Sequence, residues 1–376
     1  MLIPKSKPPG KPLSSLTVNG YKSIRELRDF KLNNLNVLIG ANGAGKSNFI
    51  GLFRLLNEMY HQNLQVYVQT QGGPDALLHF GRNTTEQLHA EFYFDLNGYK
   101  FDLIPTADNR LIFKTECTWF SGGSVDRPVK GDFSRIIGSG NSESMLIKSD
   151  DSYAKYIRQA ISSWLVYHFH DASDTAKVKQ KHSSNDNLSL KTDAANLAAY
   201  LLMLRKQYKS EYQRIVDAIR LVAPFFNDFV YRPDDPDYVE LEWTQRGRPG
   251  TPLKAHMLSD GTLRFICLAT LLLQPVTLIP STILIDEPEL GLHPYAISVL
   301  ADIFKQVSSG RLARQLIVSS QSVELINELS PEDVIVVDYE DDASIFRRFS
   351  QDELSGWLEE YSMGELWKRN ILGGRP

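Results

Sequence analysis

Residues 40–47 read Gly40-Ala41-Asn42-Gly43-Ala44-Gly45-Lys46-Ser47, and this run fits the pattern G-x-x-x-x-G-K-[ST]. The apolar run Leu35–Ile39 before it predicts a buried strand, and apolar residues at helical spacing from Phe49 predict a helix that ends near Tyr60. Glycines in such a turn let successive backbone N–H groups point at phosphate oxygens, and the helix N-terminus adds a positive dipole. The sequence therefore predicts a P-loop that binds a nucleotide.

The side chains of this loop have separate expected roles. We expect Lys46 to reach the β- and γ-phosphates and the hydroxyl of Ser47 to be a ligand of Mg²⁺. The residues expected to contact the nucleotide are Gly40, Asn42, Gly43, Ala44, Gly45, Lys46, Ser47 and Asn48.

A second signal is the apolar strand predicted over residues 282–285, which ends in Asp286 and Glu287. An aspartate at the end of such a strand helps to hold Mg²⁺, so we expect Asp286 in the metal site. The next carboxylate, Glu287, can then orient or deprotonate a water for attack on the γ-phosphate. Downstream of a P-loop, this interpretation is favoured over a strand that ends in a solvated acidic turn.

A third signal, Leu258-Ser259-Asp260-Gly261-Thr262, opens a predicted helix. From the residues alone, Ser259 is expected to be the N-cap of that helix. The interval between Ser259 and Asp286 has room for one helix and one strand.

Composition limits the class of protein. The chain has 376 residues, and 41 Lys and Arg against 45 Asp and Glu give a net charge of −4, which excludes a highly basic protein. Local basic clusters are compatible with DNA binding but do not by themselves indicate it. No apolar run is long enough to cross a bilayer, so no membrane partner is expected. Two cysteines, Cys117 and Cys267, cannot form a disulfide framework, so we expect reduced thiols and a cytoplasmic location.

The predicted organisation is α/β. Alternating residues over 88–115 predict an antiparallel meander, residues 121–150 predict surface loops, and the polar segment 171–192 predicts a mobile loop. Helices are expected over 196–208 and 212–222 and a strand over 238–244. The last third alternates helix and strand, which indicates a parallel sheet, and no heptad pattern predicts a long coiled coil. The expected parts are 1–145 (P-loop and meander), 146–250 (helical insert and connecting strands) and 251–376 (the remaining motifs).

The order of these motifs resembles the ABC-type ATPases: a P-loop, a long gap, L-S-x-G, and a hydrophobic strand with Asp-Glu. The closer resemblance is to the SMC/RecF/OLD branch, carried by residues 18–24, 35–40 and 287–294 (Glu-Pro-Glu-Leu-Gly-Leu-His-Pro). The resembling stretches, 18–47 and 251–338, frame the chain. The tail, 361–376, is similar to that of stand-alone bacterial ATPases with this architecture, several of which belong to anti-phage systems.

This resemblance implies an ABC-type P-loop NTPase head with a mixed parallel sheet, and it implies ATP hydrolysis with Mg²⁺. It also implies two ATP molecules held between two protomers, in a homodimer or higher homo-oligomer. In that arrangement Ser259, Gly261 and Thr262 are ATP ligands of the partner protomer, and Leu292-His293-Pro294 replaces a loop that crosses the dimer interface. The nucleotide state would then act on a separate effector protein or on DNA.

Two positions test the resemblance. Much of the ABC class has a histidine where this chain has Gln321, which can donate a hydrogen bond but cannot take up a proton near neutral pH. Gln321 still joins Glu287 and Lys46 as a candidate catalytic residue. Gln71 is the expected glutamine ligand of the metal, with Gln69 as a rival.

Several alternatives stay open at this point. The chain could be a nucleotide-gated scaffold with little turnover that holds an effector, which Gln321 favours slightly, or a DNA repair ATPase that resembles RecF. Two weaker clusters could hold a metal but are more simply a hairpin turn and core or loop residues: Asp338, Glu340, Asp341 and Asp342; and His168, His170 and Asp171.

Overall fold

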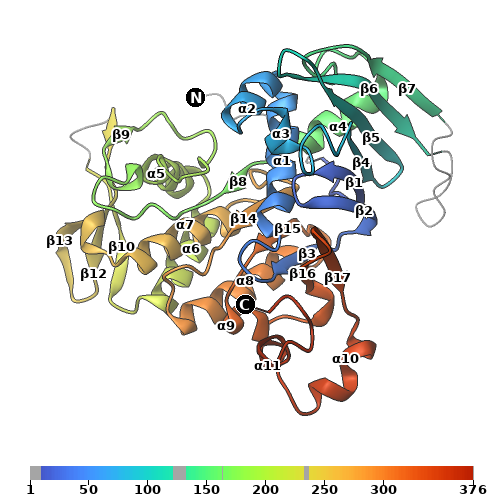
Figure 1. Ribbon diagram of the computed structural model, residues 1–376. Coiled ribbons are helices and arrows are strands. Elements are labelled where there is room, and N and C mark those ends of the chain that lie inside the picture. Colours follow the sequence, from blue (N-terminus) through green and yellow to red (C-terminus); the bar gives the residue numbers. More distant parts are fainter. Residues whose placement is uncertain (1–9, 122–132, 163, 233–236, 376) are drawn as a thin grey trace.

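The computed structural model describes residues 10–121, 133–162, 164–232 and 237–375 (Figure 1). Its central sheet has the strand order β17-β16-β3-β15-β14-β8. All of its neighbouring strands run parallel except β17, which pairs antiparallel with β16. The predicted parallel sheet is thus confirmed. Its strands are β3 (Leu35–Ile39), β8 (Val166–Tyr167), β14 (Thr282–Asp286), β15 (Gln315–Ser319), β16 (Val334–Glu340) and β17 (Ala343–Arg348).

A second, antiparallel sheet has the order β2-β1-β4-β5-β6-β7. Alternating burial along its strands, as in β4, turns one face to a core and confirms the predicted meander. The expectation of surface loops over 121–150 is wrong in part, because β7 pairs with β6, while 122–132 lie outside the described residues. The strands are β1 (Ser15–Tyr21), β2 (Ile24–Lys31), β4 (Leu88–Phe94), β5 (Asn97–Pro105), β6 (Leu111–Phe120) and β7 (Phe133–Gly138).

Two hydrophobic cores lie on opposite faces of the central sheet. Side chains alternate along a strand, so β3 sends Leu35, Val37 and Ile39 into one core and Leu38 into the other. The first core, which we call the insert-side core, is covered by α5 (Leu197–Gln207), α6 (Lys209–Val222), α7 (Asp260–Leu273), α8 (Pro294–Ser308) and α9 (Val323–Asn327). The second, the meander-side core, contains α1 (Lys46–Tyr60), α2 (Leu64–Thr70), α3 (Pro74–Leu77) and α4 (Ser152–Ile161).

The insert between β8 and α7 adds a three-stranded sheet, β10-β12-β13, and a β9–β11 pair to α5 and α6. The strand expected over 238–244 is split in two, because its first residues pair with β9 and its last residues pair with β10 and β13. The bounds are β9 (His182–Ser183), β10 (Phe226–Val230), β11 (Tyr238–Val239), β12 (Glu242–Gln245) and β13 (Arg248–Lys254). In the described part of the chain no helix exceeds 15 residues, which agrees with the expected absence of a long coiled coil.

The tail folds back onto the P-loop strand. After α10 (Gln351–Leu358) and α11 (Met363–Lys368), the buried indole Nε1 of Trp367 donates to the carbonyl of Gly374 at 2.5 Å. The N–H of Gly374 donates to Asp338 at 2.9 Å, and a Cβ on Gly374 would lie 3.3 Å from the Cα of Gly40. None of the helices in the described ranges combines the length and the apolar character needed to span a membrane.

Candidate nucleotide site

The central sheet brings the P-loop, the acidic strand end and Gln321 to one edge. Parallel pairing sets Asp286 of β14 beside Ser319 of β15, and Ser319 beside Leu38 of β3. The residues that follow these strands are therefore neighbours at their carboxyl ends, where open α/β sheets bind ligands. They are the P-loop after β3, Glu287 after β14 and Gln321 after β15.

The P-loop backbone takes a shape that its glycines permit. Gly45 has φ +116°, and a Cβ there would lie 2.0 Å from Ser344 Oγ; a Cβ on Gly40 would lie 2.1 Å from the carbonyl of Val337. Helix α1 begins directly after Gly45 with no side-chain cap and no acidic residue in its first turn. Its N-terminal N–H groups therefore suit an anion such as a phosphate.

Lys46 is buried at the start of α1, and its Nζ donates to the carbonyls of Gly40 (2.6 Å) and Ala41 (3.0 Å). Burial lowers the pKa of Lys46, while the nearby carboxylates of Glu287 and Asp286 oppose that shift. Lys46 and these carboxylates therefore interact electrostatically.

The next two residues of α1 point in different directions. Ser47 is exposed, whereas Asn48 donates to Ser23 Oγ at 2.7 Å. Ser23 Oγ also lies within hydrogen-bond distance of Ser344 Oγ, at 2.6 Å, and Ser344 donates to the carbonyl of Ala44 at 2.6 Å. These contacts fix the P-loop against the β1–β2 turn.

Asp286 and Glu287 are held by β15. Ser319 Oγ donates to Asp286, and the backbone N–H of Glu287 donates to the carbonyl of Ser319 at 3.1 Å. Glu287 has φ +44°, a left-handed conformation that is uncommon for a residue with a side chain. Such backbone conformations are concentrated at functional sites, where the surrounding contacts maintain them.

Gln321 reaches Glu287 directly. Its side-chain amide donates to the Glu287 carboxylate, and its backbone N–H donates to Glu289 Oε1 at 2.7 Å. At the position where much of the ABC class has a histidine, this chain therefore has a hydrogen-bond donor already engaged with the candidate base.

Glu289 is a site residue that the sequence reasoning missed. Its Oε1 also accepts from Ser320 Oγ at 2.8 Å, and its Oε2 is buried without a hydrogen-bond partner in the described structure. Burial raises the pKa of Glu289. The only signal in the sequence was a second carboxylate two positions after Glu287, which a solvated turn would show equally well.

The Ser259 motif lies at the start of α7. Ser259 Oγ accepts from the N–H of Thr262 at 3.2 Å, which confirms it as an N-cap. A Cβ on Gly261 would lie 2.3 Å from the carbonyl of Gly291, and Arg264 donates to the carbonyls of Leu290 (2.7 Å) and His170 (2.8 Å). The motif therefore packs against the turn that follows Glu287, with Ser259 exposed. The predicted contact of Ser259, Gly261 and Thr262 with a partner's ATP stays a prediction.

Gln71 is partly buried at the end of α2 and accepts from Lys22 Nζ at 3.1 Å, whereas the rival Gln69 is exposed. Lys22 belongs to the same β1–β2 turn as Ser23. These contacts do not connect either glutamine with a metal site, so both assignments stay predictions.

The weaker clusters do not form metal sites. No group of three or more His, Cys, Asp or Glu side chains in the described ranges could hold a metal ion. Asp341 and Asp342 form the turn of the β16–β17 hairpin, both with positive φ. His170 contacts the site through its ring, which lies 3.0 Å from the carbonyl of Asp286, and through its carbonyl, which accepts from Arg264.

The donor set fits ATP and Mg²⁺. The P-loop provides a lysine and an uncapped helix N-terminus for phosphate. Ser47 and Asp286 provide oxygen atoms, the ligands that Mg²⁺ prefers.

Comparisons with known proteins agree with this geometry. The solved Smc head bound to the C-winged helix domain of ScpA matches with TM-score 0.61 and 15% identity, covering 91% of this chain and 99% of that one. The Smc head domain from Pyrococcus furiosus, bound to the C-terminal domain of ScpA, matches with TM-score 0.59 and 14% identity, covering 93% and 98%. At these identities the likeness shows the fold: a P-loop ATPase head. No curated protein sequence matches.

The family model described as "AAA domain, putative AbiEii toxin, Type IV TA system" matches residues 35–327, which span the P-loop, the acidic strand end and Gln321. The chain belongs to this family of P-loop ATPase domains, and its fold is that of an SMC-like ABC-type head.

Proposed function

We propose that this protein binds and hydrolyses ATP with Mg²⁺, in the cytoplasm, and passes the nucleotide state to a partner. The observation that carries the proposal is the meeting of Lys46, Asp286 and Glu287 at one edge of the sheet. A positive group for phosphate, an oxygen ligand for a metal and a carboxylate for water are the groups that phosphoryl transfer to water requires.

We assign each of these residues a proposed role. Lys46 would leave the carbonyls of Gly40 and Ala41 for the more strongly attracting phosphates. Ser47 and Asp286 would hold Mg²⁺, which neutralises phosphate charge when bound. Glu287 would accept the proton of the attacking water, with its carboxylate oriented by Gln321.

A dimer completes the proposed site. Ser259 is exposed at the N-terminus of the 14-residue helix α7, next to the turn that follows Glu287. Placed against the P-loop of a second copy, the Ser259 hydroxyl and the first N–H groups of α7 would donate to the γ-phosphate.

The output is proposed to reach a separate effector protein or DNA. The Smc head structures are bound to a domain of another protein, ScpA, so this fold accommodates a second protein on its surface. Together with the family's description as a putative toxin, this supports an effector partner. The proposed role in anti-phage defence rests on the resemblance of the tail to that of stand-alone bacterial ATPases.

The substitution Glu287→Gln tests the proposed hydrolysis of ATP directly. Loss of a general base lowers turnover by roughly 10²- to 10⁴-fold. We expect the variant to keep its affinity for ATP and to accumulate as an ATP-bound dimer. Phosphate release and mass in solution, each measured with and without ATP, check both expectations. If wild-type protein binds ATP but neither turns over nor changes mass, the proposed cycle is wrong for the isolated protein.

A second candidate is a nucleotide-gated scaffold with little turnover, and the Gln321–Glu287 hydrogen bond favours it. An amide donor on the candidate base reduces the tendency of that base to accept a proton. Gln321→His separates the two functions. If wild-type turnover is near zero and the histidine variant raises it, the scaffold function is supported.

A further inference from the structure

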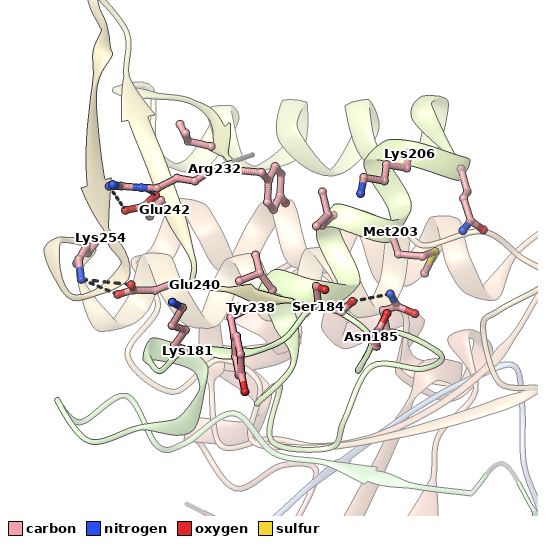
Figure 2. Close-up of a pocket in the computed structure, with 16 residues that line it drawn as sticks. Lys181, Ser184, Asn185, Met203, Lys206, Arg232, Tyr238, Glu240, Glu242 and Lys254 are labelled. Carbon is pink, nitrogen blue, oxygen red and sulfur yellow. Dashed lines mark hydrogen bonds and ion pairs between the residues drawn. The ribbon is translucent and has the colours of Figure 1, made fainter. Parts of the chain in front are cut away.

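The insert contains a pocket of about 650 Å³ that no part of the proposed ATPase cycle uses (Figure 2). Its walls come from three separate pieces: the loop 181–187, helix α5, and the strands β10 to β13. A volume of this size is typical of sites for small-molecule ligands and cofactors.

The two acidic residues of the pocket are neutralised by its own cations. Arg232 donates to both oxygens of Glu242 at 2.8 and 2.6 Å, and Lys254 lies 3.1 Å from Glu240. Figure 2 shows these two pairs together on one side of the pocket. Since each carboxylate is paired, that wall does not repel an anion strongly.

The opposite wall adds positive charge. Lys206 projects from α5 toward the middle of the pocket, whereas Lys181 lies beside Glu240, on the side of the two ion pairs (Figure 2). Lys206 therefore offers an ammonium group to an anion that enters the pocket.

The pocket also has a surface for a flat ring. Tyr238 is 55% exposed, with Lys181 Nζ 5.5 Å from its ring centroid, and Leu202 and Met203 add apolar surface from α5. The amides of Asn185 and Gln207, both on exposed residues, add hydrogen-bonding groups at the rim. Aromatic rings beside cations and amides are the components that proteins use to stack and recognise nucleobases.

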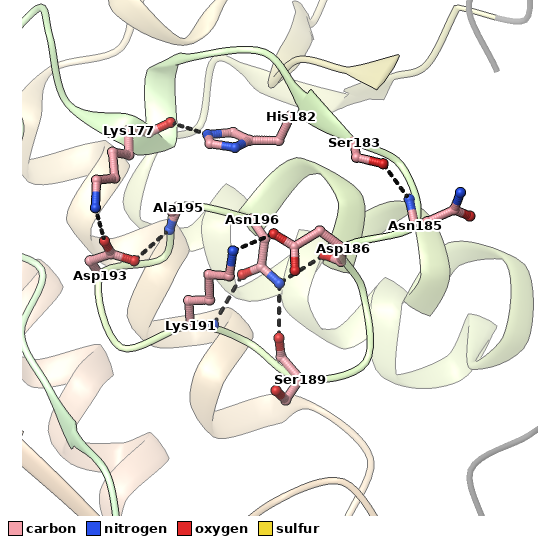
Figure 3. Close-up of polar contacts among 10 residues, drawn as sticks. All are labelled: Lys177, His182, Ser183, Asn185, Asp186, Ser189, Lys191, Asp193, Ala195 and Asn196. Carbon is pink, nitrogen blue, oxygen red and sulfur yellow. Dashed lines mark hydrogen bonds and ion pairs between the residues drawn. The ribbon is translucent and has the colours of Figure 1, made fainter. Parts of the chain in front are cut away.

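The loop that forms one wall is fixed by buried polar contacts (Figure 3). Asn196 is fully buried, and its amide donates to the carbonyls of Asp186 and Ser189, both at 2.8 Å. Its oxygen accepts from the N–H of Lys191 at 3.0 Å. The expectation of a mobile loop over 171–192 missed this network, because it depends on one residue beyond the segment.

We propose that this pocket binds a nucleoside phosphate, either a free nucleotide or the end of a nucleic-acid strand. The base stacks on Tyr238 and the phosphate pairs with Lys206. The proposal goes beyond ATP hydrolysis, because the pocket and the P-loop share no residue.

The test uses the full chain carrying Lys46→Ala, which removes the lysine of the P-loop. The probes are fluorescently labelled AMP, GMP, CMP and UMP, and a labelled 12-nucleotide oligo-dT with a 5′ phosphate, with binding followed by anisotropy. Lys206→Glu and Tyr238→Ala are compared with matched controls outside the pocket. These are Lys209→Glu, at the start of α6, and Tyr156→Ala, a tyrosine that is 56% exposed.

We expect at least one probe to bind, at least tenfold weaker binding in each pocket variant, and changes within twofold in each control. Binding of mononucleotides identifies a free nucleotide as the ligand, and binding of the oligonucleotide alone identifies a strand end. The proposal is overturned if no probe binds, if Lys209→Glu weakens binding as much as Lys206→Glu, or if inorganic phosphate displaces the probe as well as unlabelled AMP does. ATP turnover of the chain with Lys46 intact is measured separately, so a failed pocket and a failed ATPase are distinguishable.

Discussion

The edge of the central sheet and the pocket of the insert are both polar sites, but they are assembled differently. At the sheet edge, backbone pairing of β3, β15 and β14 places the P-loop, Gln321 and Glu287 side by side. In the insert, backbone pairing is short, and a side-chain network around Asn196 holds the loop that closes the pocket. A site made by strand ends is set by the fold, whereas a site made by a loop depends on single side chains.

The largest expected difference between the regions comes from Asn196→Ala. The substitution leaves two carbonyls and one N–H without their buried partner, which costs about 2 to 4 kcal/mol of unfolding free energy. The affinity of the insert pocket for a nucleoside phosphate should decrease together with this stability. ATP turnover per folded molecule should stay within twofold of wild type. Urea unfolding and turnover on the same preparation measure both quantities.

Asn185→Ala, in the same loop but exposed, is the matched control and should leave stability nearly unchanged. If Asn196→Ala lowers ATP turnover as strongly as it lowers stability, the two regions are not independent and the comparison fails.

A moderate effect is expected at the sheet edge from Ser319→Ala. This change removes the donor to Asp286 and leaves the backbone pairing of β14 with β15 in place. Loss of a hydrogen bond behind a metal ligand typically lowers metal affinity or activity by about 10- to 100-fold, and we expect the lower end here. Turnover as a function of Mg²⁺ concentration should show a raised requirement for the metal.

Ser281→Ala is the control, because Ser281 Oγ is buried near the opposite end of β14 without a hydrogen-bond partner among the described atoms. Equal losses in both variants would mean that Ser319 acts through packing and not through Asp286.

The smallest expected effect is a change in pH dependence from Glu289→Gln. Burial raises the pKa of Glu289 above 4.5, so the folded protein binds this proton more tightly than the unfolded chain does. Its contribution to stability is therefore greatest below pH 4.5 and is lost as the pH rises through the folded-state pKa. The glutamine variant should gain stability relative to wild type between pH 5 and pH 8.

Urea unfolding at those two pH values measures this difference. Glu360→Gln, at an exposed residue, should run parallel to wild type. A constant offset between wild type and Glu289→Gln at both pH values would contradict the proposed titration.

The sequence alone was informative where one local pattern determines the backbone. The spacing of Gly40, Gly45 and Lys46 is enough to define the P-loop. Downstream of such a loop, an apolar strand that ends in Asp286 and Glu287 is most simply interpreted as the strand that holds the metal ligand and the candidate base. The meander followed from the alternation of side chains along each strand, and the parallel sheet followed from the alternation of helix and strand in the last third of the chain.

The rest depends on contacts between distant residues, which periodicity does not record. Glu289 meets the backbone of Gln321 only because β14 and β15 are neighbours. The close approach of Gly374 to Gly40 joins residues that are more than 300 positions apart in the sequence. The pocket in the insert requires a loop, a helix and a sheet that no local pattern connects.

The two cores of the molecule give the sheet edge a mechanical role. Helix α1 belongs to the meander-side core, whereas α8 and α9, which follow β14 and β15, belong to the insert-side core. A ligand that contacts both Lys46 and Glu287 therefore joins the helix that covers one face of the sheet to the strand end that leads to the helices on the other face. A bound ligand would then restrict the movement of α1 relative to α8 and α9. Release of the ligand would remove that restriction.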